Sequence, residues 1–133
     1  MNLDEYYELA ETLCEHAMGV NADHAAVDLI ANHRVWLLRR DFAPFIQRGR
    51  HQSTGEPMAN IQWRAAHTAL QRGQLPCSGS EANVLRIASS LGAGIPIRLR
   101  HVLGNLDQAN IANVVRAIGL ANDTWPISTK DTL

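Results

Sequence analysis

The sequence lacks most of the residue patterns that mark a well-defined catalytic or cofactor site. Its two cysteines, Cys14 and Cys77, lie far apart without C-x-x-C spacing, which indicates neither a disulfide framework nor a thiolate metal site. The longest uninterrupted apolar run, Val35 to Leu38, is too short to cross a membrane. No G-x-x-x-x-G-K-[ST] phosphate loop is present. We therefore expect no cofactor and no membrane partner.

Positive charge is missing from the first quarter of the chain. Residues 1–33 contain seven acids and no Lys or Arg, the reverse of the basic start of a secretory signal, so we expect a cytoplasmic protein. Residues 34–72 contain seven Arg and two acids, and the remainder is nearly balanced. The overall net charge of −1 thus conceals an acidic segment followed by a basic one. The two segments could lie against each other, or each could recruit a partner of opposite sign.

What the sequence does contain is a series of helix patterns. Ser78 to Glu81 has the S-x-x-E form of a capping box, and an apolar stripe at helical spacing follows until Gly92. Asn2 to Glu5 resembles a second capping box, at the start of an amphipathic helix with an acidic outer face. Further helices are expected at about residues 21–38, 41–46, 57–72, 96–104 and 105–122.

These patterns predict an all-α domain of five to six helices over residues 1–123, followed by a tail at 124–133. The first two helices are expected to form an antiparallel hairpin that packs on a C-terminal three-helix unit. Residues 48–56 are polar and are expected to form a mobile loop, and no sheet is expected. The predicted core includes Leu13, Ile30, Leu37, Leu70, Leu85, Leu91 and Val114.

Four segments resemble a family of small uncharacterised proteins from actinobacteria. They read RRDF (39–42), GEPMANIQW (55–63), LPCSGSEANVLRIASSL (75–91) and IPIRLRHVLGNLD (95–107). The resemblance spans roughly residues 35 to 120. It implies a single cytoplasmic bacterial domain, and it assigns no activity and no functional residue.

Cys77 is the one candidate nucleophile. It precedes a predicted helix start, where the helix dipole and free N–H groups can lower the pKa of a thiol. Glu81 would oppose a neighbouring thiolate, however, and no histidine lies nearby in the sequence. A buried structural thiol is the favoured interpretation, and an enzyme using Cys77 is the least favoured function.

His24 and Asp28 stand four residues apart, as two metal ligands on one helix face would. The pattern supplies no defined third or fourth ligand, and six scattered histidines produce such a pair by chance. A metal site is therefore not predicted.

The middle segment is the best candidate for binding a charged partner, through Arg39, Arg40, Arg48, Arg50 and His51. These side chains suit a phosphate backbone or an acidic protein surface, and pairing with Glu8, Glu11 and Glu15 of the same chain is the simpler alternative.

The leading hypothesis is a non-catalytic interaction module that self-associates or binds a protein partner, with Tyr6, Tyr7 and Trp36 at the interface. The alternative is a nucleic-acid-associated regulator that uses the Arg-rich segment 34–51. A three-helix DNA-binding unit over residues 81–120, exposing Arg98, Arg100 and His101, is a further but weaker interpretation.

Overall fold

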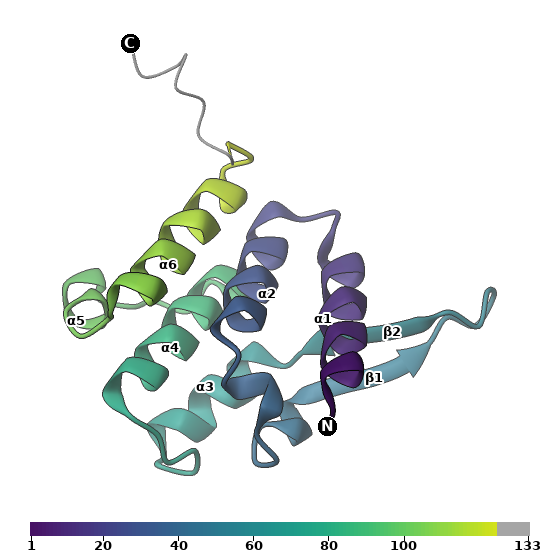
Figure 1. The fold of residues 1–133 in the computed structure, drawn as a ribbon, viewed down its shortest axis with the longest axis horizontal. Coiled ribbons are helices and arrows are strands. Elements are labelled where there is room, and N and C mark those ends of the chain that lie inside the picture. The colour runs from purple at the N-terminus through teal and green to yellow at the C-terminus, as the bar shows by residue number, and fades with distance from the viewer. Residues whose placement is uncertain (125–133) are drawn as a thin grey trace.

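The computed structural model describes residues 1–124, so all but the first residue of the predicted tail lies outside the described part. Figure 1 shows a group of packed helices from which one β-hairpin projects. The α-helices are α1 (Leu3–Ala17), α2 (Asn21–His33), α3 (Trp63–Gln71), α4 (Gly79–Ala93), α5 (Leu99–Leu103) and α6 (Gln108–Ala121). Two 3₁₀ helices, η1 (Trp36–Leu38) and η2 (Ala43–Phe45), precede the strands β1 (Ile46–Arg50) and β2 (Pro57–Ile61).

The β-hairpin corrects the all-α prediction: the described residues are mainly helical, with a small antiparallel sheet. Residues 48–56, which were expected to form a loop, form the end of strand β1 and the turn. Residues 57–61, which were expected to begin a helix, form strand β2. Gly55 closes the turn with a φ of +72°, a conformation that favours glycine. Pro57 is tolerated because it is the first residue of an edge strand.

Both predicted capping boxes are confirmed, and a side chain also caps a third helix. Asn2 and Ser78 each form a complete capping box with the glutamate three residues later, and Asp107 caps α6. Helix α2 differs, since its N-cap is Val20 and no side chain caps it. It also does not continue through Leu38, because Arg34 adopts a left-handed φ of 59° and ends the helix.

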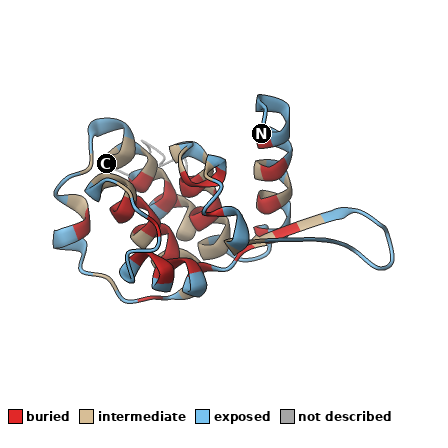
Figure 2. Ribbon diagram, turned by 90° about the horizontal axis from the view of Figure 1, so that it is seen from below, coloured by how far each residue is buried: buried red, intermediate tan, exposed pale blue. Residues whose placement is uncertain are grey.

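Helix α2 lies at the centre of the molecule, between α4 and α6 on one side and α1 on the other. Helix α1 runs antiparallel to α2, as predicted, and also packs against β2. Figure 2 shows buried residues concentrated where the helices meet, whereas the end of the hairpin is exposed. Six of the seven predicted core residues are buried, and Leu91 is partly buried. No helix among residues 1–124 is long and apolar enough to cross a membrane.

The contact between α3 and α4 depends on a glycine. A Cβ atom added at Gly92 would collide with the indole ring of Trp63, which begins α3 and is buried. We expect Gly92→Ala to lower the free energy of unfolding by about 1–3 kcal/mol, as overpacking does. Gly19→Ala is the matched control, because no atom lies within 4 Å of its added Cβ. Equal stability of the two variants in urea unfolding would contradict this account of the contact.

Candidate functional site

A groove of about 1170 Å³ lies between α1 and the β-hairpin, beside the contact of α1 with β2. Its α1 wall includes Glu5, Glu8, Thr12 and Glu15, which share one helix face because they are spaced three or four residues apart. Leu9, at the edge of this stripe, is buried and gives the groove an apolar base. The acidic outer face predicted for the first helix therefore forms one wall of the groove.

The opposite wall comes from the hairpin. In the strand register, Arg48 lies opposite Ala59 and Arg50 lies opposite Pro57, so these residues share one face of the two-stranded sheet. Ala59 is buried, and α1 packs against its strand. Arg48 and Arg50 thus lie on the hairpin face that borders α1, and both line the groove.

The two walls carry opposite charges that do not pair directly. Among residues 1–124, the ion pairs are Arg39 with Asp41 and Arg116 with Asp28, and neither crosses the groove. Arg50 donates through Nη1 to the backbone oxygen of Gly55 at 2.9 Å. The structure therefore brings the acidic helix and part of the basic segment to one groove, but the predicted pairing with Glu8, Glu11 and Glu15 is not seen among the ion pairs of the described residues.

The groove as a whole is acidic. Five carboxylates line it and only two guanidinium groups do, which leaves an excess of three negative charges among its side chains. The carboxylates belong to Glu5, Glu8, Glu11, Glu15 and Glu56. Such a surface attracts cationic groups and disfavours an extended phosphate backbone.

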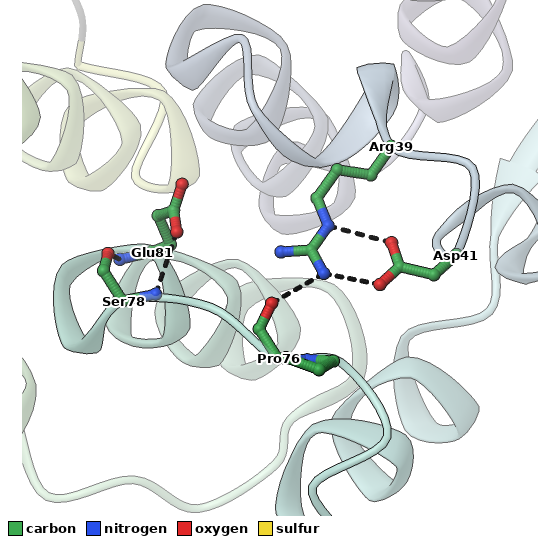
Figure 3. A network of polar contacts seen from close by, with 5 residues as sticks. All are labelled: Arg39, Asp41, Pro76, Ser78 and Glu81. Atoms are coloured by element: carbon green, nitrogen blue, oxygen red, sulfur yellow. Dashed lines mark hydrogen bonds and ion pairs between the residues drawn. The ribbon is translucent and has the colours of Figure 1, made fainter.

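Arg39, predicted to bind a partner, makes its polar contacts within the chain, with Asp41 and Pro76 (Figure 3). Its Nε donates to Asp41 at 2.8 Å, and its Nη2 donates to the backbone oxygen of Pro76 at 2.7 Å. The guanidinium carbon also lies 4.6 Å from the ring centroid of Trp36, a cation–π distance. The hydrogen bond from Arg39 lowers the pKa of Asp41 below its ordinary value. Arg39 thus connects η1 to the segment before α4.

Arg40 and His51 are exposed, and of the five predicted binding residues only Arg48 and Arg50 line the groove. His51 lies at the hairpin turn, where its backbone N–H donates to the backbone oxygen of Glu56 at 2.9 Å. Arg40 forms no hydrogen bond or ion pair with another residue of the described part.

Arg39 and its neighbour Arg40 form a natural comparison. We expect Arg39→Ala to reduce the free energy of unfolding by about 1–2 kcal/mol, because it removes hydrogen bonds and a cation–π contact at once. Arg40→Ala should change it by less than about 0.5 kcal/mol, as surface substitutions usually do. Urea unfolding of both variants measures the difference, and comparable losses would refute the structural role of Arg39.

Two of the three residues predicted at a protein interface are core residues. Tyr6 and Trp36 are 4% and 0% exposed, so neither can contact a partner directly. The hydroxyl of Tyr6 donates to the backbone oxygen of Ala31, and the indole N–H of Trp36 donates to that of Glu81 at 3.0 Å. Buried Tyr and Trp need such acceptors, which explains why they occupy these positions. Tyr7 is exposed, as the interface prediction requires.

The weak metal candidate is not assembled. Asp28 accepts hydrogen bonds from Arg116 Nε at 2.9 Å and from Asn32 Nδ2 at 3.1 Å, so its carboxylate already joins α2 to α6. Within the described part of the chain, no group of three or more His, Cys, Asp or Glu side chains is placed to hold a metal ion.

Cys77 is partly buried before α4, and burial raises the pKa of its thiol despite the nearby Arg39. Glu81 is committed to the capping box, where hydrogen bonds from Ser78 lower the pKa of its carboxyl group. This environment favours the protonated thiol rather than an activated nucleophile.

The raised pKa of the thiol gives a direct test of its chemistry. We expect Cys77, measured in a Cys14→Ser variant, to react with iodoacetamide at neutral pH more slowly than a free thiol does, because less thiolate is present. Mass spectrometry of the labelled chain gives the rate. Faster labelling than the free thiol would revive the nucleophile hypothesis.

The sequence interpretation missed the hairpin residues that line the groove, among them Glu56, Met58 and Ala59. Ile61 fits the helical spacing of the residues after it, and this pattern predicts one helix over residues 57–72 instead of a strand followed by a helix. The available signal was a glycine at the end of a short polar turn between two five-residue segments, a pattern typical of a β-hairpin.

Comparison of this chain with protein-family models, with curated proteins and with solved structures finds no match in any of the three.

Proposed function

We propose that this chain is a non-catalytic interaction module that binds a basic segment of a protein partner in the groove between α1 and the β-hairpin. The observation that carries the proposal is the excess of carboxylates over guanidinium groups in a groove with an apolar base, with no ion pair among these groups in the described part of the chain. A basic, partly apolar segment would neutralise these carboxylates and cover Met58, which is partly exposed in the groove.

Both charge signs in the groove have a use in this proposal. The glutamates of α1 attract the partner's cationic side chains, whereas Arg48 and Arg50 offer donors to its carbonyl or carboxylate groups. Opposite signs on facing walls also fix the orientation of a bound segment, because the reversed orientation would place like charges together.

The nucleic-acid alternative receives less support from this arrangement. Arg39 is engaged within the fold, and Arg48 and Arg50 line a groove in which carboxylates predominate. A duplex backbone approaching them would meet Glu8, Glu11 and Glu15.

Location in the cytoplasm and membership of the actinobacterial family remain predictions.

The proposal predicts charge-selective binding of a peptide that alternates Arg with Leu. At about 50 mM salt, where surface electrostatics are weakly screened, this peptide should bind and a Glu–Leu peptide should not. Replacing Glu8, Glu11 and Glu15 with Gln should weaken binding about tenfold, since each exposed charge contributes about 0.5 kcal/mol. Fluorescence anisotropy measures both affinities.

A matched control separates the groove from overall charge. Replacing Asp4, Asp23 and Asp123 with Asn changes the net charge equally, and none of the three lines the groove. Equal weakening in both triple variants would defeat the proposal.

A second experiment identifies the natural partner. A photoreactive amino acid replaces Thr12, which lines the groove, and is crosslinked in native lysate. A basic protein segment whose crosslink disappears in the Gln variant supports the proposal, whereas a nucleic acid or a second copy of this chain argues against it.

A further inference from the structure

A second hollow, of about 380 Å³, lies between α3, α4 and α5, and no carboxylate lines it. Its titratable residues are all basic: His67 from α3, Arg86 from α4, and Arg98 and His101 from the segment that begins α5. The amides of Gln71 and Asn83 complete its polar lining. It shares no residue with the groove between α1 and the hairpin.

His67 is the most informative member of this cluster. Its side chain lines the hollow although the residue is only 8% exposed, and no hydrogen bond to another described residue satisfies its ring nitrogens. Burial and the nearby Arg86 lower the pKa of its imidazole. The ring nitrogens are not among the buried polar atoms that lack a partner, so they reach solvent through the hollow and are placed to hydrogen-bond a ligand there.

Arg86 is held in place while most of its donors stay free. Its Nη1 donates to Oδ1 of Asn83 at 2.8 Å, and Nδ2 of Asn83 in turn donates to Oδ1 of Asn105 at 2.8 Å. This chain of amides positions the guanidinium group without neutralising it. No acidic side chain forms an ion pair with Arg86 in the described part.

The remaining two cations are accessible from solvent. Arg98, the N-cap residue of α5, and His101 within α5 are exposed, and both line the hollow. The hollow is thus lined by a buried histidine, an arginine held by an amide, and two exposed cationic side chains.

We propose that this hollow binds the terminal phosphate of a small phosphate monoester, with His67 and Arg86 deep in the site and Arg98 and His101 at its opening. A volume of about 380 Å³ suits a small ligand. Guanidinium and imidazolium groups together match the charge and the several acceptor oxygens of a phosphate dianion. A terminal phosphate can enter to reach buried His67, whereas the diester backbone of a duplex stays at the surface.

The test follows the ring of His67 by NMR while inorganic phosphate or ribose 5-phosphate is added. Bound dianion stabilises the imidazolium form, so the pKa of His67 should rise from its lowered value towards about 6.5 or above. Arg86→Gln and Arg98→Gln should each weaken phosphate binding about tenfold, the effect of losing one charge-assisted hydrogen bond. Arg40→Gln removes an exposed arginine outside the hollow and should leave the affinity unchanged.

Each alternative outcome is informative. Because Arg98 is exposed, its variant should stay folded even if Arg86→Gln does not. An unchanged pKa of His67 at saturating phosphate, or equal affinities for Arg98→Gln and Arg40→Gln, would overturn the proposal. Binding of duplex DNA through Arg98 and Arg100 with no response at His67 would also overturn it, in favour of a backbone contact. The Gln variants of the groove glutamates should retain phosphate binding, which separates this result from the groove proposal.

Discussion

The packing of α2 against α4 and α6 is the constraint on which the rest of the structure depends. Ala25, Ala26, Leu29 and Ile30 are all completely buried, and the small alanines let neighbouring helices approach closely. The chain leaves α2 abruptly at Arg34, which allows Trp36 to reach the backbone of α4 at Glu81 and lets Phe42 pack against Trp36. Their placement in turn brings Arg39 to the segment that precedes α4. One buried helix therefore determines the path of the next ten residues.

The same constraint creates the acidic groove. Since α4 and α6 occupy one side of α2, α1 lies on the other side and completes its burial against β2. Its apolar stripe, Tyr6, Leu9 and Leu13, is used in these contacts. The glutamates on the adjoining face then border the hairpin. Charges that are separated by more than thirty residues in the sequence face each other because the hydrophobic stripe leaves α1 no other orientation.

The sequence predicted what local chemistry determines and missed what distant contacts determine. Ser78 and Asn2 cap helices through bonds to residues three positions away, so their patterns are readable directly. The pairing of Arg48 with Ala59 requires a turn to bring two five-residue strands together, and α1 packs against the second of them. Arg39 and Arg40 are identical in type and adjacent, yet their roles differ because Asp41 and Pro76 meet only one of them. No spacing rule distinguishes the two.

What distinguishes the arginines of this protein is the presence or absence of a carboxylate partner. Arg39 and Arg116 pair with Asp41 and Asp28 and thereby hold elements together. Arg48 lies among glutamates, which reduce its attraction for an incoming anion even without direct contact. Arg86 and Arg98 line a hollow that contains no acid, so their charge is fully available there. An anionic ligand is therefore directed to the hollow beside α5, and a cationic one to the groove beside α1, by the positions of the acids rather than by the number of bases.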